Sequence, residues 1–305
     1  MRYLVTGAAG FIGSQLLRTL LERGHDAIGW DAFTDYYDAQ LKEENAAGLP
    51  VERLDLAEDE LDVAGYDGVF HLAGQPGVAS FGSVFPVYVR QNVLASQRLF
   101  EAVVAAGTRV VFASSSSIYG DAAAYPTPED TVPRPIAPYG ITKLACEHLA
   151  RAYEREFGLD AVTVRYFTIY GPRQRPDMAL PVILSCLLEG RPFELHGDGM
   201  QSRSFTFVDD AVEATILAME RATVGAVFNV GGGEEVSMLE AIETLGRISG
   251  RRLELITAPR RLGDQRRTAA DTTRIREALG WTATTPFAEG LEAQWRWAAA
   301  RVAAA

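Results

Sequence analysis

The sequence of 305 residues contains only two cysteines, Cys146 and Cys186, and both fall within helical patterns. We therefore expect two buried free thiols rather than a disulfide framework, and no metal site. The sequence also lacks an apolar run of membrane-spanning length, and its first predicted strand begins at residue 2, which leaves no room for a signal peptide. We expect a cytoplasmic protein without a membrane partner.

Positive charge is scarce as well. The chain carries 29 Lys and Arg residues against 40 Asp and Glu residues, which gives a net charge of −11. Such an excess of acid argues against nucleic acid or an anionic membrane surface as the main partner. An anionic ligand would have to be held by local arginines. The hydrophobic content of 48% is ordinary for a globular enzyme.

Strand and helix patterns alternate over the first 165 residues. Short apolar runs predict strands, and longer runs with apolar residues at helical spacing predict helices at 11–21, 84–105 and 139–157. This alternation predicts an α/β fold with a doubly wound parallel sheet. The predicted strands are Tyr3–Val5, Asp26–Trp30, Val51–Leu54, Gly68–Leu72, Arg109–Ala113 and Ala161–Arg165.

The pattern changes beyond Gly171, where prolines punctuate short segments. We predict a first domain over residues 1–171 and a smaller mixed α/β C-terminal lobe over 172–200 and 223–305, which binds the substrate. A strand at Ser204–Phe207 and a helix at Asp209–Arg221, within about 201–222, are predicted to return to the first domain.

A glycine-rich turn follows the first strand. Gly7, Gly10 and Gly13 form G-x-x-G-x-x-G, and a helical pattern begins directly after Gly10. Glycines let the backbone approach a pyrophosphate, and the helix N-terminus offers unpaired N–H groups. The second strand ends in Asp31, 24 residues after Gly7, where a carboxylate can bind both ribose hydroxyls. No Arg follows to accept a 2′-phosphate, so a Rossmann-type domain that binds NAD is predicted.

Polar clusters follow three of the other predicted strands, at the edge of the sheet where ligands bind in such folds. They are His71-Leu-Ala-Gly-Gln75, Ser114-Ser-Ser-Ser-Ile-Tyr-Gly120, and the long run Tyr166 to Met178. A fourth cluster, Pro138 to Lys143, opens the predicted helix that follows the serines. Because His71 lies within its strand, we expect a core residue with a satisfied ring rather than a base.

Tyr139 and Lys143 are four residues apart, so on a helix they share one face. A free phenol titrates at about pH 10, too high for a base at neutral pH, but a neighbouring ammonium and a positively charged nicotinamide favour the phenolate. Tyr-x-x-x-Lys alone is a common accident in helices. After a dinucleotide turn and a serine-rich strand end, it predicts a base and its activator for the oxidation of an alcohol.

The chain resembles the extended short-chain dehydrogenases/reductases, in particular the nucleotide-sugar 4-epimerases, over essentially its whole length. The resemblance implies that Tyr139 is the catalytic base, Lys143 its activator and Ser115 the hydroxyl that helps to orient the alcohol. The motifs that carry it are Gly7/Gly10/Gly13, Asp31, Asp55-Leu56, Tyr139-x-x-x-Lys143, Gly197-Asp-Gly199 and Arg261-Leu-Gly-Asp264.

The resemblance also implies one site for NAD and one for a UDP-sugar. Arg203 and Arg261 would grip the diphosphate, because bidentate guanidinium groups suit that anion in an acidic protein. Asp264 would lie near the nucleotide, and Asp55 and Leu56 at the adenine of NAD. The expected cofactor contacts are Gly7, Gly10, Phe11, Ile12, Gly13, Asp31, Asp55, Leu56, Leu72, Ala73, Gln75, Tyr139, Lys143 and Tyr166. The expected substrate contacts are Ser116, Ser117, Thr168, Arg175, Gln201, Arg203, Arg261 and Asp264.

Enzymes of this kind first oxidise the 4-hydroxyl of the sugar to a ketone, and neighbouring groups decide the fate of that ketone. Dehydratases place Asp and Glu just after the orienting hydroxyl residue, and decarboxylating relatives place a Glu two residues before the Tyr of the Tyr-Gly turn. Here these positions are Ser116 and Ser117, which exchange no proton near neutral pH. The ketone can then only be reduced again, and return of hydride to the opposite face inverts C4.

The string Thr168 to Met178, with the serines, resembles UDP-glucuronate 4-epimerases, whereas galactose/glucose epimerases usually carry Asn in place of Thr168. Ser116, Ser117 and Thr168 could donate hydrogen bonds to a C6 carboxylate, and Arg175 could supply charge or anchor the adjoining loop. We expect conversion of UDP-glucuronate to UDP-galacturonate, with UDP-glucose/UDP-galactose as the alternative. Decarboxylation, dehydration and a non-catalytic NAD-binding sensor are less favoured.

The helices predicted at 84–105 and 139–157 carry more apolar residues than one face against the sheet requires. The resemblance implies that such a pair often forms a four-helix interface between two subunits. A homodimer is therefore expected.

Overall fold

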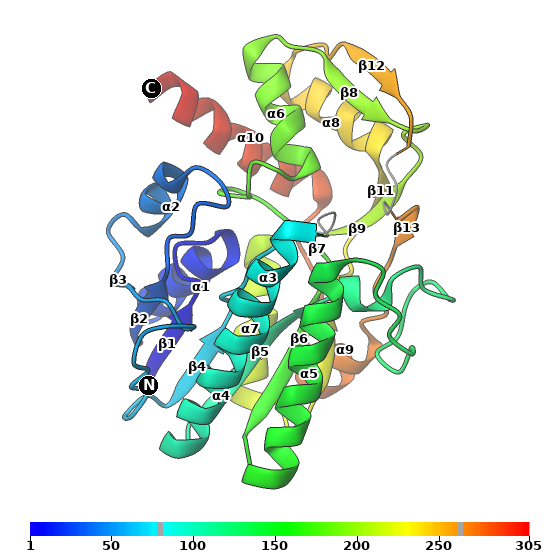
Figure 1. The fold of residues 1–305 in the computed structure, drawn as a ribbon. Coiled ribbons are helices and arrows are strands. Elements are labelled where there is room, and N and C mark those ends of the chain that lie inside the picture. Colours follow the sequence, from blue (N-terminus) through cyan, green and yellow to red (C-terminus); the bar gives the residue numbers. More distant parts are fainter. Residues whose placement is uncertain (78–81, 261–264, 305) are drawn as a thin grey trace.

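The computed structural model describes residues 1–77, 82–260 and 265–304. Its centre is a seven-stranded sheet in the order β10-β6-β5-β4-β1-β2-β3, in which all neighbouring strands are parallel (Figure 1). The chain reverses its direction of travel through the sheet between β1 and β4, which creates a crevice at their carboxyl ends. The strands are β1 (Arg2–Thr6), β2 (Asp26–Asp31), β3 (Val51–Arg53), β4 (Gly68–His71), β5 (Arg109–Ser115), β6 (Ala161–Tyr166) and β10 (Val227–Val230).

Helices cover both faces of this sheet, because successive strand residues point to opposite sides. Tyr3 and Val5 pack in one core cluster with side chains of α1 and α7, whereas Leu4 packs in a second cluster with those of α4 and α5. The predicted doubly wound parallel sheet is confirmed. The covering helices are α1 (Phe11–Glu22) and α7 (Val208–Arg221) on the first face, and α4 (Ala95–Ala106) and α5 (Pro138–Phe157) on the second (Figure 1).

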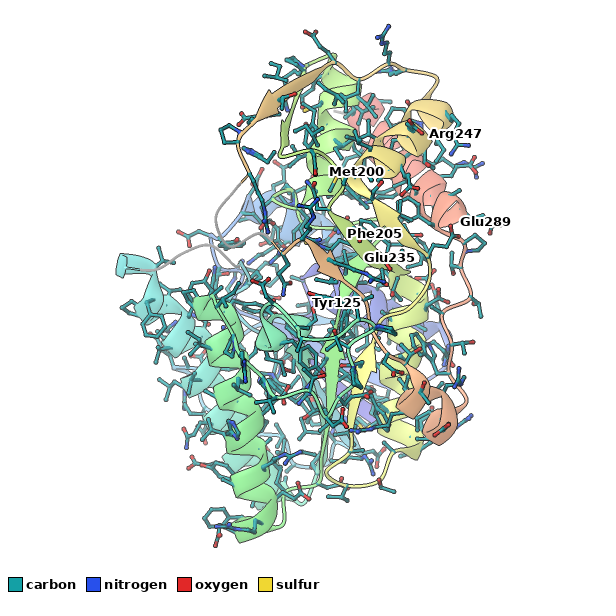
Figure 2. All side chains as sticks on the ribbon, turned by 90° about the vertical axis from the view of Figure 1, so that its right-hand side faces the viewer. Tyr125, Met200, Phe205, Glu235, Arg247 and Glu289 are labelled. Atoms are coloured by element: carbon teal, nitrogen blue, oxygen red, sulfur yellow. The ribbon has the colours of Figure 1, made fainter. Side chains whose placement is uncertain are left out.

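A mixed α/β lobe lies beyond the carboxyl ends of the strands. Its sheet is built on β9, which pairs in parallel with β7 and β13 and antiparallel with β11. Phe205 of β9 packs against Phe287 with ring centroids 4.9 Å apart, in the middle of the molecule (Figure 2). The elements are β7 (Thr168–Tyr170), β8 (Phe193–His196), β9 (Ser202–Phe207), β11 (Glu235–Ser237), β12 (Leu255–Ala258), β13 (Arg267–Thr268), α6 (Ala179–Glu189), α8 (Met238–Ser249) and α10 (Phe287–Ala304). Two short helices, α2 (Ala39–Ala46) and α9 (Thr273–Leu279), lie against the main sheet domain.

The strand predicted at 204–207 does not join the main sheet; it is part of β9 in the small sheet. The seventh strand of the main sheet is instead β10, which lies in the range predicted for the C-terminal lobe. The pairing partners decide this, since β10 pairs with β6 at the edge of the main sheet, whereas β9 pairs with β7, β11 and β13. Burial does not distinguish the two strands, because Ser204–Phe207 and Phe228–Val230 are all buried. Helix α7 does pack on the main sheet.

The single helix predicted at 84–105 is interrupted. A 3-10 turn (Gly82–Val84), a short helix α3 (Phe85–Tyr88) and a π-helical segment η2 (Val89–Leu94) precede α4. The π-helical segment rotates the following residues and aims Asn92 inward, where its amide accepts from the backbone N–H of Gln75 at 2.7 Å and donates to Thr142 Oγ1 at 2.9 Å. The sequence does not reveal the π-helical segment, because Val89–Leu94 contains neither Gly nor Pro.

Two smaller expectations can be compared with the structure. Cys146 and Cys186 are buried free thiols, as predicted. Of the helices in the described part of the chain, none combines the length and the apolar character needed to cross a membrane.

Candidate functional site

A cavity of about 930 Å³ lies between the carboxyl ends of the main-sheet strands and the C-terminal lobe. Its walls come from both parts of the molecule, so neither part encloses it alone. The predicted site residues among its lining are Gly7, Gly10, Phe11, Ile12, Gly13, Asp31, Leu56, Leu72, Ala73, Gln75, Ser115, Ser116, Ser117, Tyr139, Lys143, Tyr166, Thr168, Arg175, Gln201 and Arg203.

Of the remaining predicted residues, one does not line this cavity and two lie outside the described part of the chain. Asp55 is absent from its lining, and its carboxylate instead accepts from Arg90 at 2.8 Å and from the backbone N–H of Ala57 at 2.9 Å. Arg261 and Asp264 lie outside the described residues. Of the predicted pair Asp55-Leu56, only Leu56 lines the cavity, together with its apolar neighbour Leu54.

The glycine turn is packed so closely that side chains are excluded. Gly7 adopts φ +73°, and a Cβ there would lie 2.8 Å from the backbone nitrogen of Ala73. A Cβ on Gly13 would lie 2.8 Å from the carbonyl carbon of Gly7 and closer still to its oxygen. Helix α1 begins just beyond the turn, and the first N–H groups of a helix have no partner within it. This cradle fits a pyrophosphate.

Asp31 lies at the end of β2 beside the glycine turn. Its two carboxylate oxygens accept from the backbone N–H of Ala9 at 3.0 Å and of Phe33 at 2.7 Å, which fixes their direction. A carboxylate held there, next to a pyrophosphate cradle, fits the adenosine ribose of NAD.

Tyr139 and Lys143 lie in the first turns of α5, which begins at Pro138 after the N-cap Ala137. The Lys143 ammonium is 5.9 Å from the centroid of the Tyr139 ring. It is buried, and it donates a hydrogen bond to the carbonyl oxygen of Ala113 on β5 at 2.8 Å. An ammonium carries three donors, so two remain for a ligand in the cavity.

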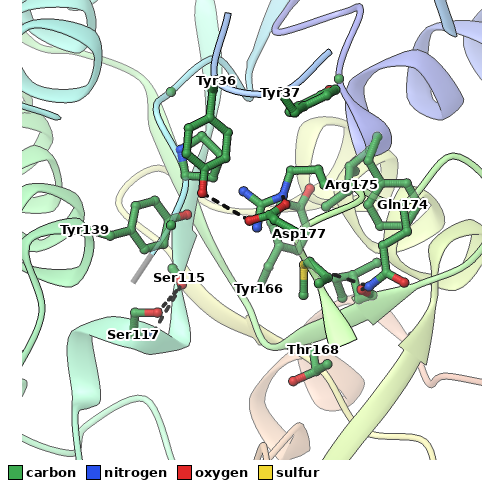
Figure 3. Close-up of a pocket in the computed structure, with 18 of the residues that line it drawn as sticks. Tyr36, Tyr37, Ser115, Ser117, Tyr139, Tyr166, Thr168, Gln174, Arg175 and Asp177 are labelled. Atoms are coloured by element: carbon green, nitrogen blue, oxygen red, sulfur yellow. Dashed lines mark hydrogen bonds and ion pairs between the residues drawn. The ribbon is translucent and has the colours of Figure 1, made fainter. Parts of the chain in front are cut away.

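We use the name serine turn for Ser115–Tyr119, which continues β5 into a 3-10 helix. Ser115 Oγ accepts from the backbone N–H of Ser117 at 3.1 Å and lies 3.1 Å from Ser117 Oγ. A Cβ on Gly140 would lie 2.9 Å from the carbonyl carbon of Ser117, so the turn rests directly on the first turn of α5. Figure 3 shows Ser115, Ser117 and Tyr139 on one side of the cavity, opposite Thr168 and Arg175.

His71 is a core residue with a satisfied ring, as predicted. It is fully buried, and its ring nitrogens lie 2.8 Å from Thr6 Oγ1 and 2.9 Å from Ser96 Oγ. Burial, and then the nearby Lys143 ammonium, lower the pKa of His71 to about 3. A ring that stays neutral at every ordinary pH does not serve as a base. Instead Thr6 Oγ1 accepts from the backbone N–H of Ala73, so the histidine supports the wall of the cavity.

Tyr36 and Asp177 were not predicted, yet they meet across the cavity. Tyr36, in the loop after β2, donates from its hydroxyl to Asp177 Oδ2 at 3.0 Å (Figure 3). Asp177 in turn lies 3.3 Å from Arg175 Nε. Burial and Asp177 raise the pKa of Tyr36 to about 12, which keeps the phenol a donor. Arg175 is therefore engaged by Asp177, which favours its loop-anchoring role over direct charge for a substrate.

Lys42 is a third lining residue that was not predicted from the sequence. Its ammonium is buried in the cofactor half of the cavity and donates to the carbonyl oxygen of Thr34 at 2.6 Å and to Thr34 Oγ1 at 2.9 Å. Burial lowers the pKa of Lys42. In the sequence it is one lysine on a short polar helix, and no spacing distinguishes it from a surface charge.

The substrate half of the cavity is built on the small sheet. Parallel pairing of β7 with β9 sets Thr168 opposite Phe205, and Arg203 lies two residues earlier on the same face of β9. Gln201 donates to the carbonyl oxygen of His196 at 3.1 Å. Tyr166 also lines the cavity, and its hydroxyl lies 2.6 Å from Thr215 Oγ1. The lobe therefore brings a hydroxyl group, of Thr168, and a guanidinium group, of Arg203, to the wall of the same cavity.

Comparison with known proteins extends these findings. A model of the NAD dependent epimerase/dehydratase family matches residues 3–231. UDP-glucuronic acid 4-epimerase from Bacillus cereus, solved in complex with UDP-glucuronic acid and NAD, has a TM-score of 0.93 at 37% sequence identity, covering 98% of this chain and 99% of that chain. UDP-glucose 4-epimerase from Mycolicibacterium smegmatis is 38% identical over 301 residues, 95% of this chain and 96% of that protein. UDP-glucuronate 4-epimerase from Thermodesulfobacterium geofontis is 33% identical over 309 residues, 97% of this chain and 95% of that protein. The similarity thus spans both the sheet domain and the C-terminal lobe.

Proposed function

The chain belongs to the NAD dependent epimerase/dehydratase family, and we propose that it inverts C4 of a UDP-sugar with NAD as its cofactor. We propose UDP-glucuronate and UDP-galacturonate as the pair that it interconverts. One observation carries this proposal: Ser115, Ser116 and Ser117 bring hydroxyls, and neither an acid nor a base, to the cavity wall, and Ser115 and Ser117 lie on the same side as Tyr139. The relatives from B. cereus and T. geofontis support the choice of sugar.

We assign the chemistry to three side chains. Tyr139 takes the proton of the C4 hydroxyl, Ser115 orients that hydroxyl, and Lys143 stabilises the phenolate with its ammonium. Bound NAD supplies a reversible hydride acceptor, which the glycine turn and Asp31 would hold at its pyrophosphate and adenosine ribose. Because Lys143 is already fixed to the strand end by Ala113, the base and the orienting serine keep a constant relation to the sheet.

The fate of the ketone depends on which groups can exchange protons nearby. Among the described residues that line the cavity, the carboxylates are Asp31, Asp177 and Glu194. Asp31 is held by two backbone N–H groups, Asp177 by Tyr36 and Arg175, and Glu194 lies on the exposed edge beside His196. We infer that none of them serves elimination of water, so the ketone is reduced again.

The choice of UDP-glucuronate rests on hydroxyl donors for its C6 carboxylate. Ser116, Ser117 and Thr168 line the cavity near the proposed reaction centre, and neutral donors bind a carboxylate without promoting its loss. We propose that Gln201 and Arg203, together with Arg261 and Asp264 as the resemblance implies, hold the UDP part.

The direct test is incubation of the purified protein with UDP-glucuronate, followed by NMR of the products. We expect UDP-galacturonate to form until the two epimers reach equilibrium. Tyr139→Phe should lose this activity while NAD stays bound, which also excludes a non-catalytic NAD-binding sensor. UDP-pentose as the main product, or no turnover, would refute the proposal, and full activity in Tyr139→Phe would refute the mechanism.

UDP-glucose/UDP-galactose remains the second candidate, since a relative at 38% identity is a UDP-glucose 4-epimerase. Assay of the wild type on both sugars separates the two. Because Arg175 is engaged by Asp177 and anchors its loop, we expect Arg175→Ala to lower the activity on either sugar. A rate on UDP-galactose far above that on UDP-glucuronate would favour the second candidate, and the reverse would favour the first.

We propose in addition that the chain forms a homodimer through α3, η2 and α5. Leu99 and Phe100 of α4 and Cys146 of α5 are core residues, but several apolar side chains of α3, η2, α5 and the 3-10 turn before α3 are exposed. The exposed residues are Val84, Val87, Val89, Leu94, Ile141 and Phe157, with relative exposures of 37–64%. Light scattering of the purified protein tests this: a dimer should become a monomer in Leu94→Glu.

A further inference from the structure

A buried ion pair lies beneath the serine turn and has no part in the chemistry assigned so far. Arg165 of β6 and Glu147 of α5 have side-chain exposures of 6% and 7%. The guanidinium binds the carboxylate in a bidentate way, from Nε to Oε1 at 3.0 Å and from NH2 to Oε2 at 2.7 Å. Such a pair is costly to bury, and well-packed apolar residues often stabilise a fold equally well. Its presence here calls for a reason beyond stability.

The ion pair makes hydrogen bonds at both ends of the serine turn. Ser114, just before the turn, donates from Oγ to Glu147 Oε1 at 2.5 Å. Tyr119, its last residue, accepts on its hydroxyl from Arg165 NH1 at 2.7 Å and donates to Asn229 Oδ1 of β10 at 2.8 Å. The three serine hydroxyls that face the cavity lie between these two anchors.

The same ion pair fixes the turn relative to the proposed base. Glu147 follows Tyr139 and Lys143 at intervals of four residues, so the three side chains lie along one face of α5. A second, steric contact joins the two parts at Gly140, which has no room for a Cβ against Ser117. The base, its activator and the carboxylate that holds the serines are therefore parts of one rigid helix.

We propose that Glu147 and Arg165 are positioning residues, which act through Ser114 and Tyr119 to hold the serine turn in a fixed orientation to Tyr139. This inference rests on the proposed function. It gives the ion pair a role in whether the 4-keto intermediate is reduced again or loses CO₂. The serines bind the C6 carboxylate, so their orientation sets the orientation of that group.

The orientation matters because a 4-keto-uronate is a β-keto acid. Loss of CO₂ breaks the C5–C6 bond, moves its electron pair into the enolate of the C4 ketone, and ends with a proton from water on C5. The bond breaks readily only when it stands perpendicular to the plane of the ketone, where it overlaps the carbonyl π system. A rigid serine turn keeps the carboxylate out of that geometry, and a loosened turn lets it in.

The test compares Tyr119→Phe with Tyr170→Phe. Each variant removes one fully or nearly fully buried phenol hydroxyl that makes a hydrogen bond, but Tyr170 donates to the carbonyl oxygen of Phe287 in the lobe core and does not line the cavity. Products from UDP-glucuronate are separated by NMR, and thermal unfolding is measured in parallel. In Tyr119→Phe, which loses the hydrogen bonds to Arg165 and Asn229, we expect the ratio of decarboxylated nucleotide to UDP-galacturonate to rise at least about fivefold, because one lost buried hydrogen bond already accounts for that factor. In Tyr170→Phe the ratio should stay at the wild-type value.

Ser114→Ala provides a second variant at the other anchor and should change the product ratio in the same direction. Equal ratios in wild type, Tyr119→Phe and Ser114→Ala, with the loss confined to thermal stability, would show a merely structural network and overturn the inference. If the wild type epimerises only UDP-glucose, the substrate proposal fails separately. The positioning role is then judged on kcat for that sugar, which must fall in Tyr119→Phe and not in Tyr170→Phe.

Discussion

Substitution of Gly13 by Ala tests the dinucleotide cradle most severely. The added Cβ would lie 2.8 Å from the carbonyl carbon of Gly7 and 3.2 Å from Cα of Ala8. Ordinary contact between carbons needs about 3.5 Å, so these contacts alone would require the turn to open by roughly 0.7 Å, and the still closer approach to the carbonyl oxygen of Gly7 requires more. Both neighbours are backbone atoms of the same tight turn and cannot move aside by rotation of a side chain.

Two opposing effects set the magnitude. Forcing an extra methyl group into a packed region costs typically about 1–3 kcal/mol, whereas Ala in a helix gains up to about 1 kcal/mol over Gly. A net loss of about 1–2 kcal/mol should appear in stability. If the displaced turn also carries the pyrophosphate contacts, the dissociation constant for NAD should rise about tenfold, since each 1.4 kcal/mol is a factor of about ten.

Gly246→Ala is the matched control. Gly246 lies inside helix α8, where the nearest contact of an added Cβ is the carbonyl oxygen of Arg251 at 3.4 Å. This variant should gain stability and keep the NAD affinity of the wild type. Calorimetric titration with NAD and thermal unfolding with and without NAD measure both quantities. If Gly13→Ala binds NAD as tightly as Gly246→Ala and unfolds at the same temperature, the cradle is not where we place it.

Two further predictions concern the walls of the cavity. Tyr36→Phe removes the hydroxyl that donates to Asp177 across the cavity. The variant should release NAD about fivefold faster than the wild type on dialysis, as expected for one lost hydrogen bond. Chromatography measures the NAD that remains bound, and the same retention as in the wild type would show that this hydrogen bond does not hold the cofactor. His71→Gln tests the buried neutral ring. The pKa of His71 is about 3 in the folded protein and about 6.5 when unfolded, so the unfolded chain binds an extra proton between these values and stability falls as the pH drops below about 6.5. Between pH 7 and pH 5 the free energy of unfolding of the wild type should fall by roughly 2 kcal/mol because of this group, whereas that of His71→Gln should not. The same change in melting temperature with pH in both proteins would contradict this.

The main sheet was predictable because its strands are buried on both faces. A strand covered twice needs a continuous apolar run, and Leu4, Val69 and Val110 stand in such runs. The later strands were assigned wrongly because their burial is alike. Ser204–Phe207 and Phe228–Val230 are all buried, and only the pairing partners decide which strand enters the main sheet.

Residues of the site were predictable where backbone geometry or covalent spacing limits the choice of side chain. Gly7, Gly13 and the Tyr139–Lys143 pair are of this kind, and all four line the cavity. Contacts between distant segments leave no such mark on the sequence. Tyr36 meets Asp177 across 141 residues, a pairing that depends on how the C-terminal lobe sits against the sheet.

The Asp55-Leu56 motif predicted where Asp55 lies along the chain, but not which groups its carboxylate contacts. The acid sits at the end of β3 as expected, but Arg90 and a backbone N–H occupy its carboxylate. Arg90 lies within the π-helical segment, which the sequence pattern predicted as part of a regular helix. The partner of Asp55 therefore comes from an element whose geometry was not predicted.

The central claim is that hydrogen removed from C4 returns to the same carbon on the opposite face. UDP-glucuronate labelled with deuterium at C4 tests it directly, in ordinary water, with the products followed by NMR and mass spectrometry. We predict UDP-galacturonate that keeps the deuterium at C4. Loss of the label to solvent, or a UDP-pentose as the main product, would contradict the account.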